Sequence, residues 1–415
     1  MELVFHDVIC SLSSSLDLVG VSESHHGKRT ALMAAGIAKK LDWGTEFELD
    51  MLYASMLHDC GLSNAENKNH LFPENEWEKL HEHCERGSQY LTDCPVFGRY
   101  APWILHHHTR WHDLKNLDLP EMDKLAANLI FLVDRVDFLQ AKYVDDTRHD
   151  SDILLEKHHI MNEVLAFRGS FFAPVLVDIF LEMGQRESFW LSMDPCYIDA
   201  SVRVYCKLSE RKTASFPMLR SIATLFSKFI DAKSPYTKEH SKYVAILARY
   251  LAKQLDFSKE QQQHIELAGM LHDLGKLRVP NYILNKQAPL NESERACMLR
   301  HSFDTMELLN IAFPHTKIAQ WAGHHHENLN GHGYPFHLTA AELDLGSRIV
   351  AVADIFQALV QKRPYRNSLN LGQIKLIMDD MVTEGKLDGD VVNVLAKNYE
   401  SCYILAQSPD STINL

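Results

Sequence analysis

Histidine is the residue type that stands out in this 415-residue sequence. There are 24 histidines, and several adjoin one another, in the pair 25–26 and in the triplets 106–108 and 324–326. Histidine is the side chain that most often binds metal ions in proteins. A tag or a run of surface histidines would be the alternative, but these clusters are internal and lie within apolar patterns. The sequence therefore predicts metal chemistry.

The potential ligands recur in two sets, in the same order along the chain. The dyad His58-Asp59 returns 214 residues later as His272-Asp273, and the later matches follow at offsets of 218 and 220 residues. The first set comprises His26, His58, Asp59, His83, His107, His108 and Asp134, and the second comprises His240, His272, Asp273, His301, His325, His326 and Asp354. Seven ordered matches are not expected by chance, so we interpret the chain as a tandem duplication of one metal-ligand scaffold.

The second set has more ligands than one transition-metal ion uses, because such ions typically take three or four protein ligands and keep open positions. Two ions that share one carboxylate could use all seven, and Asp273 is the candidate bridge. The other ligands then divide into two groups, which are His240, His272 and Asp354 for one ion and His301, His325 and His326 for the other. Two ions about 3.5–4 Å apart suit in-line attack on phosphorus. The alternative of capping and core histidines does not explain seven in one ordered set.

Helices must position these ligands. After His240, apolar residues recur through 244–255 at the spacing of an amphipathic helix. Ser258 and Gln261 have the pattern of a capping box that opens the next helix, and Gly275 suits the end of that helix. This second helix carries the dyad.

The first half has the same signals, with Thr45 and Glu48 at the opening and Gly61 at the end. No alternating run of strand length appears anywhere in the chain. The predicted fold class is therefore all-α, with two tandem helical-bundle domains. A Ser-, Thr- and Lys-rich stretch before Pro217 marks the boundary, so we predict domains over 1–205 and 216–415.

Composition excludes several classes of protein. The formal net charge of −13 argues against non-specific binding to DNA, RNA or anionic membranes. The N-terminus lacks the basic region of a signal peptide, and no apolar stretch approaches the ~18–20 residues of a membrane span. The eight cysteines form no CxxC pair, which is typical of free thiols in a reducing compartment. We expect a cytoplasmic protein.

The second half resembles the HD-GYP branch of the HD phosphohydrolase superfamily over about 216–370. The segments that carry the resemblance are HSKYVAILARYLAKQL, LHDLGKLRVP, HHENLNGHGYP and IVAVADIFQALVQKRPYR. The resemblance implies HD-type helical bundles and a bacterial metallophosphodiesterase that linearises cyclic dinucleotides. It also implies that Lys276 and Arg363 contact phosphate, which agrees with the chemistry of the two side chains, although each could be a plain surface residue. Asp273 and Lys276 are the expected catalytic residues.

The resemblance implies Fe or Mn as the metals, and imidazole and carboxylate ligands also suit Zn, Ni or Co. Members with a third metal have a Glu where this chain has Tyr236, so we expect two divalent ions. The family also often has Asp where Gln357 stands, which we interpret as an altered surrounding of the ligands.

The triplet Gly333, Tyr334 and Pro335 supplies no metal ligand and predicts a defined turn. The family uses this loop to shape the substrate side or to contact proteins, and a plain surface turn is the alternative. A homodimer or a protein bound at this loop is compatible with the sequence.

The first half keeps its seven potential ligands but departs from the family elsewhere. Leu62 stands at the position of Lys276, Tyr143 stands at that of Arg363, and the Gly-Tyr-Pro triplet is missing. We therefore expect a regulatory or structural domain that retains metal positions without independent activity.

Three classes of function are compatible with these residues. The first is hydrolysis of a cyclic dinucleotide, with cyclic di-GMP as the general substrate of the family. The tandem layout is similar to that of bacterial phosphodiesterases acting on 3′3′-cyclic GMP-AMP, and this favours the second substrate by analogy. The other classes are a non-enzymatic signalling module with structural metals and a di-iron oxygenase. The phosphate-binding cations favour hydrolysis.

Overall fold

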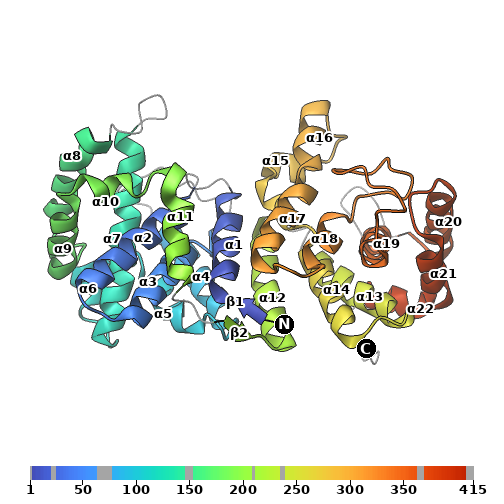
Figure 1. Cartoon of the computed structure of the whole chain (residues 1–415), viewed down its shortest axis with the longest axis horizontal. Coiled ribbons are helices and arrows are strands. Elements are labelled where there is room, and N and C mark those ends of the chain that lie inside the picture. Colours follow the sequence, from blue (N-terminus) through green and yellow to red (C-terminus); the bar gives the residue numbers. More distant parts are fainter. Residues whose placement is uncertain are drawn as a thin grey trace. The chain divides into compact units, whose positions relative to one another are not determined.

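The computed structural model describes residues 2–19, 25–62, 77–144, 153–207, 211–233, 239–361 and 369–407. The chain divides into two compact units, Met1–Ala214 and Ser215–Leu415, and each is built from helices (Figure 1). Strands β1 (Glu2–Val4) and β2 (Arg211–Thr213) pair antiparallel in the first unit and form the only sheet among the described residues. The predicted all-α class is confirmed. The small ribbon was not predicted, because a strand of three residues is too short to show an alternating pattern.

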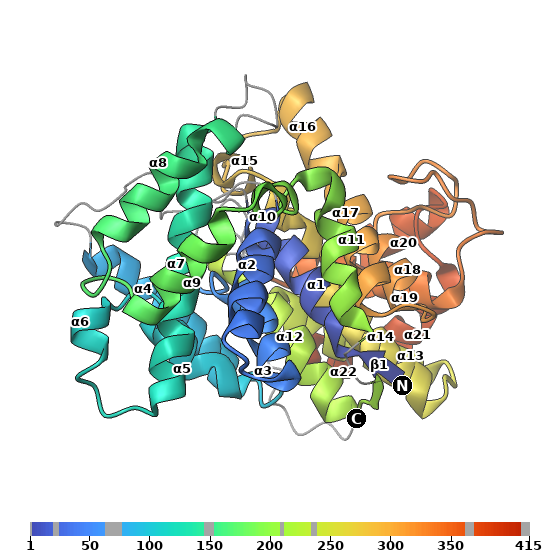
Figure 2. The same cartoon turned by 60° about the vertical axis from the view of Figure 1, so that its left-hand side comes forward.

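Three helices of the first unit, α2, α3 and α7, pack against one another (Figures 1 and 2). His26 lies on α2 and Asp134 on α7, while the dyad His58-Asp59 directly follows α3. The helices of this unit are α1 (Phe5–Asp17), α2 (His26–Lys40), α3 (Thr45–Leu57), α4 (Trp77–Thr92), η1 (Gly98–Tyr100), α5 (Ala101–His106), α6 (Trp111–Leu114), α7 (Glu121–Tyr143), α8 (Ile153–Ala166), α9 (Pro174–Gly184), α10 (Glu187–Leu191) and α11 (Pro195–Cys206).

The second unit repeats this packing with α13, α14 and α19, while α17 packs against α18. Its helices are α12 (Phe216–Lys233), α13 (His240–Gln254), α14 (Lys259–Leu271), η3 (Leu274–Arg278), α15 (Asn281–Leu284), α16 (Glu292–Leu299), α17 (His301–Ala312), α18 (Ile318–Gly323), α19 (Leu345–Val360), α20 (Leu371–Thr383), α21 (Gly389–Lys397) and α22 (Tyr399–Leu405). No helix of the described part of the chain is long and apolar enough to cross a membrane.

The duplication extends to backbone conformation. His25 and Glu239 precede the first ligand helix of each unit, and both have a left-handed backbone, with φ of 66° and 72°. Asp42 and Asp256, which follow these helices, also have positive φ values of 53° and 58°. Non-glycine residues rarely adopt this conformation, so its recurrence at the same offset of 214 residues supports the predicted repeat.

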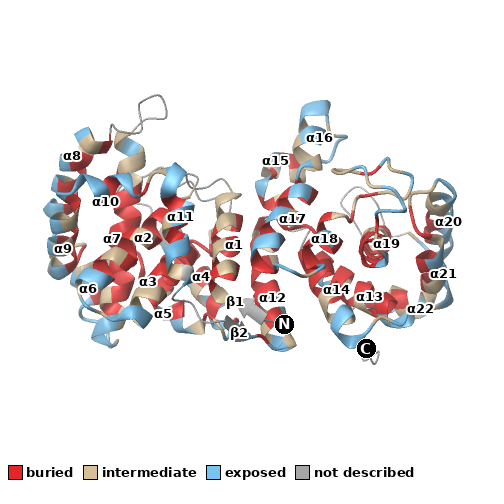
Figure 3. Ribbon diagram, in the orientation of Figure 1, coloured by how far each residue is buried: buried red, intermediate tan, exposed pale blue. Residues whose placement is uncertain are grey.

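Burial follows the predicted helix pattern, with the apolar face of each ligand helix turned to the core (Figure 3). On α13, Val244, Leu247 and Leu251 are completely buried. The predicted capping box at α14 is confirmed, because Ser258 and Gln261 bond reciprocally to each other's backbone N–H.

The capping prediction for the first unit was wrong. Helix α3 begins at Thr45, and Gly44 stands at its N-cap without a side-chain hydrogen bond. The Thr-x-x-Glu pattern failed because the threonine is already inside the helix, where its hydroxyl cannot reach forward as an N-cap does.

The prediction that glycine ends the dyad helix was also wrong. Helix α14 ends at Leu271, and Gly275 lies within η3. A Cβ at Gly275 would stand 2.0 Å from the carbonyl oxygen of His301, and a Cβ at Gly61 would stand 2.0 Å from that of His83. Both glycines are therefore required by the close approach of a ligand-bearing helix.

Replacing Gly275 with alanine should lower the free energy of unfolding by about 1–3 kcal/mol or more, because the added methyl group overpacks the backbone of His301. Gly372→Ala is the matched control, since its Cβ would meet its nearest atom at 3.4 Å, in Asn370. The control should change stability by no more than about 1 kcal/mol. Urea denaturation followed by circular dichroism measures both variants, and equal midpoints would contradict the packing role of Gly275.

Candidate metal centres

All seven predicted ligands of the second unit converge in the structure. Their ligand atoms fall into overlapping groups within which every pair lies within 4.8 Å. The three groups are His240, His272 and Asp273; His272, His325 and Asp354; and His301, His325 and His326. They come from the start of α13, the end of α14, the start of α17, the end of α18 and the middle of α19.

The carboxylate of Asp273 lies between two pairs of histidines. Its Oδ2 is 3.4 Å from Nε2 of His272 and 3.8 Å from Nε2 of His240. Its Oδ1 is 3.6 Å from Nε2 of His301 and 3.8 Å from Nε2 of His325. Each oxygen thus faces its own pair, which is the arrangement that a bridging carboxylate needs.

Asp354 completes the first of these groups. Its Oδ1 lies 3.2 Å from Nε2 of His240 and 3.7 Å from Nε2 of His272. These three side chains are the ones that the sequence analysis assigned to one ion, and His325 also lies within reach of His272 and Asp354.

Backbone carbonyls aim the histidines. In three cases Nδ1 donates a hydrogen bond to the carbonyl oxygen three residues earlier, at distances of 2.6–2.8 Å. The pairs are His272 with Gly269, His301 with Met298, and His325 with Ala322. A carbonyl can only accept, so Nδ1 carries the hydrogen and Nε2 presents its lone pair to the centre.

His240 is held differently, because its Nδ1 lies 2.5 Å from the amide oxygen of Gln357. The corresponding residue of the first unit is Asp137, whose Oδ2 lies 2.6 Å from Nδ1 of His26. The amide oxygen of Gln357 aims the imidazole as a carboxylate would, but without the negative charge.

The electrostatics of the second centre suit a cation. Burial opposes ionisation of Asp273, but the positive charges of His272 and Lys276 outweigh it and hold the pKa of this carboxyl well below its usual value. Burial lowers the pKa of His301 to about 3, so this imidazole is neutral and able to ligate at neutral pH. Oδ1 of Asp273 and Nε2 of His272 are buried without a hydrogen-bond partner. A buried anion with such atoms fits a metal ion.

Lys276 belongs to the second centre, since its ammonium lies 2.6 Å from Oδ2 of Asp273. Its backbone N–H donates to the carbonyl of Asp273, and Leu62 makes the same bond to Asp59. The two turns match, so Leu62 leaves the first unit without a cation at this point. The predicted phosphate contact Arg363 lies outside the described residues, as does Tyr236.

The Gly-Tyr-Pro loop folds back onto the ligands. The N–H of Tyr334 donates to the carbonyl of His326, and the centres of their rings are 4.8 Å apart. A Cβ at Gly333 would stand 2.3 Å from the backbone nitrogen of Asn328. Pro335 closes the triplet. The loop therefore packs beside a predicted ligand, His326.

The first unit has the same arrangement as His240, His272, Asp273 and Asp354 of the second unit. Nε2 of His26 lies 3.5 Å from Oδ2 of Asp59 and 3.3 Å from Oδ1 of Asp134. Nε2 of His58 lies 3.4 Å and 3.6 Å from the same two oxygens. The other oxygen of Asp59 lies 3.9 Å from Nε2 of His83.

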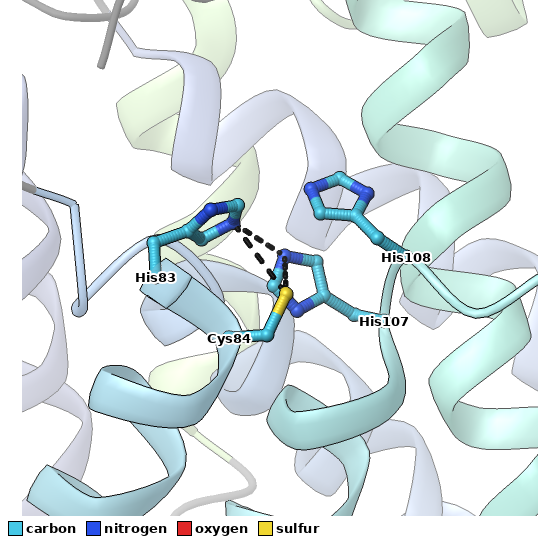
Figure 4. A group of neighbouring side chains, drawn as sticks. All are labelled: His83, Cys84, His107 and His108. Carbon is cyan, nitrogen blue, oxygen red and sulfur yellow. Dashed lines mark hydrogen bonds between the residues drawn. The ribbon is translucent and has the colours of Figure 1, made fainter. Parts of the chain in front are cut away.

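Two residues beside the first centre were missed by sequence reasoning. The guanidinium of Arg135 lies 3.2 Å from Oδ2 of Asp134, and Ile355 stands at the matching position of the second unit. Cys84 groups with His83, His107 and His108 (Figure 4). The signal available in the sequence was the adjacency of Cys84 to a repeated histidine, which a search restricted to His and Asp passes over.

Comparison with known proteins gives matches over both units. The chain matches the HD domain family over residues 14–120 and 224–391. It is 38% identical to the 3′3′-cGAMP-specific phosphodiesterase 1 of Vibrio cholerae over 403 residues, which cover 96% of this chain and 93% of the relative. It is 36% identical to a cyclic di-GMP phosphodiesterase of Pseudomonas aeruginosa over 35% of each chain.

A solved structure has the same fold. It is the crystal structure of a cyclic GMP-AMP-specific phosphodiesterase of V. cholerae, with a TM-score of 0.67 and 23% sequence identity. The match covers 96% of this chain and 98% of that chain, so the fold is shared over both units.

The metal-free protein should lose stability as the pH falls from 7 to 5. Burial lowers the pKa of His301 to about 3 and that of His326 to about 4, from an ordinary value of 6.5. The unfolded chain therefore binds protons in this range while these folded imidazoles do not, so the free energy of unfolding decreases on acidification. His272 acts in the opposite direction. Burial lowers its pKa, but the negative charge of Asp273 outweighs burial and raises it, so this one group stabilises the folded protein on acidification.

Urea denaturation of chelator-treated protein at the two pH values measures this effect. The midpoint should be lower at pH 5, and His326→Asn should reduce the difference. A midpoint that is equal or higher at pH 5 would contradict the expected direction.

Proposed function

The chain belongs to the HD domain family, and we propose on that premise that it is a metal-dependent phosphodiesterase that hydrolyses a cyclic dinucleotide to a linear dinucleotide. The observation that carries the proposal is the position of Asp273, whose two oxygens face separate pairs of histidines. One shared carboxylate between two imidazole groups is the arrangement for two ions acting on one phosphate.

The substrate that we propose is 3′3′-cyclic GMP-AMP. A relative named for this substrate matches 96% of the chain and therefore both units, whereas relatives named for cyclic di-GMP, such as those from P. aeruginosa and Xanthomonas campestris, match 35% and 36%. The tandem organisation thus supports 3′3′-cyclic GMP-AMP. Cyclic di-GMP is the second candidate, because relatives named for it also match part of the chain.

Two divalent transition-metal ions, Fe or Mn by resemblance, would be held by the seven ligands of the second unit, with Asp273 shared. When bound, such ions activate water as a nucleophile and neutralise charge on the phosphoryl oxygens. The chain's own part is to aim the ligands through the carbonyls behind the histidines.

Lys276 is the residue that we assign to a non-bridging phosphate oxygen. Its ammonium adjoins Asp273, and 22% of its side chain is exposed, so it borders both the centre and solvent. Arg363 is the second proposed cation, and the loop bearing Tyr334 shapes the substrate side beside His326. A cation placed where charge develops stabilises the transition state.

We assign a regulatory or structural role to the first unit. It has Leu62 at the position of the lysine, and its other matched position is Tyr143, the last residue of α7, whose hydroxyl donates to Glu163. Tyr143 stands nine residues, or about two and a half turns, beyond Asp134. The first unit therefore lacks the cations at the two matched positions.

The double substitution His272→Ala and Asp273→Ala in the full chain should abolish hydrolysis, because both ions lose the shared carboxylate. The matched change His58→Ala and Asp59→Ala should only shift the rate. The assay incubates protein with Mn²⁺ or Fe²⁺ and each cyclic dinucleotide and separates the products by chromatography. Near wild-type hydrolysis by the first variant would disprove the assignment of the active unit, and faster turnover of cyclic di-GMP would disprove the substrate.

Lys276→Ala should lower kcat by about 10²–10³-fold while bound metal stays unchanged, because one charge contact to the phosphate is lost. Lys286→Ala is a matched control, since Lys286 pairs with Glu294 outside the ligand set. Steady-state kinetics and elemental analysis are read together. A wild-type kcat at full metal content would remove Lys276 from the mechanism.

A further inference from the structure

We propose that the first unit holds a zinc ion on Cys84 together with His83, His107 and His108. This is a thiolate site that the second unit lacks, and it does not depend on the proposed phosphodiesterase activity. The cysteine changes which metal this part of the duplicated scaffold prefers.

The four side chains come from two packed helices. His83 and Cys84 are neighbours on α4, while His107 and His108 directly follow α5, which packs against α4 (Figure 4). All four are buried, and Cys84 and His107 are completely inaccessible to solvent. One ligand atom from each lies within 4.8 Å of the other three.

The distances among Cys84, His83 and His107 fit three corners of a tetrahedral zinc site, and the ligand atom of His108 lies within 4.8 Å of these three. Sγ of Cys84 lies 3.8 Å from Nε2 of His83 and 4.0 Å from Nε2 of His107, and the two nitrogens are 3.2 Å apart. Zinc bonds of about 2.0–2.1 Å to nitrogen and 2.3 Å to sulfur place tetrahedral ligands about 3.3 Å apart for two nitrogens and about 3.6 Å apart for nitrogen and sulfur. Sγ of Cys84 therefore needs to move only a few tenths of an ångström closer to the two nitrogens.

The imidazoles are ready to ligate. Nδ1 of His107 donates to the carbonyl of Ile104 at 2.6 Å, so its Nε2 presents a lone pair to Cys84 and His83. His108 is 94% buried, and its Nδ1 has no hydrogen-bond partner. Buried polar atoms normally have a partner, so this ring nitrogen, in a residue within reach of three ligand atoms, independently indicates a metal ligand.

The second unit shows what the cysteine adds. Ser302 occupies the matching position, with its hydroxyl 3.4 Å from Nε2 of His301. A neutral hydroxyl is a poor ligand, whereas a thiolate selects softer ions such as zinc. The thiol gives up its proton when the metal binds.

Four protein ligands also close the coordination of a tetrahedral ion, which is typical of structural zinc. Without an open position the ion cannot admit substrate. A structural zinc site therefore explains why the first unit has these histidines although Leu62 stands at the position of Lys276.

Cobalt in place of zinc tests the thiolate directly. The full-length protein is stripped of metal and titrated with Co²⁺, and the near-ultraviolet absorption of sulfur-to-cobalt charge transfer is recorded. The wild type and the control Cys94→Ser, which removes another buried cysteine of the same unit, should show this band. Cys84→Ser, which copies Ser302, should lose it. This variant should also bind zinc more weakly in chelator competition, by more than the roughly 10–100-fold that is typical when a group behind a ligand is lost. An unchanged cobalt spectrum in Cys84→Ser would overturn the proposal.

A second measurement covers the case in which Cys84→Ser fails to fold. Zinc X-ray absorption of the wild type should show a sulfur neighbour at about 2.3 Å. A shell of nitrogen and oxygen alone would overturn the proposal. Both readouts are independent of hydrolysis, so loss of the proposed phosphodiesterase function would leave them intact.

Discussion

The position of the Asp273 carboxylate between two pairs of histidines is the constraint on which the second unit depends. Its two oxygens can face two pairs of histidines only if α13, α14, α17 and α18 approach within a few ångströms of one point. Gly275 permits this approach, because the backbone of His301 occupies the space where a side chain would stand. The carbonyls behind the imidazoles then fix which ring nitrogen faces inward. Packing and chemistry are therefore set by the same few contacts.

Duplication lets the two units be compared residue by residue. Both keep the dyad, the glycine after it and the left-handed residue before the first ligand helix. The two units differ in the charged and metal-binding side chains that lie next to the shared ligand positions. The second unit has Lys276 beside its carboxylate, and the first has Cys84 beside its histidines. The duplicated scaffold thus places different donor groups beside the histidines of its two units.

The sequence predicted the parts of the molecule that depend on spacing. The helical class and the capping box at Ser258 follow from patterns along the chain, and the structure confirms both. The repeated His and Asp side chains were also found from spacing, and the structure brings them close together. The role of Gly275 could not be predicted, because the helix that it touches lies elsewhere in the sequence. The failed cap at Thr45 shows that a local pattern does not place a helix start to one residue. Cys84 was missed because its significance depends on three histidines brought together by folding.

We propose that the carboxylate of Asp273 joins two ions in the second unit. An anomalous diffraction map of the manganese-loaded full-length protein, recorded at the manganese edge, tests this directly. Two peaks are expected in the second unit, about 3.5–4 Å apart, with one oxygen of Asp273 bound at each. A single peak, or two peaks with Asp273 bound to only one of them, would contradict it.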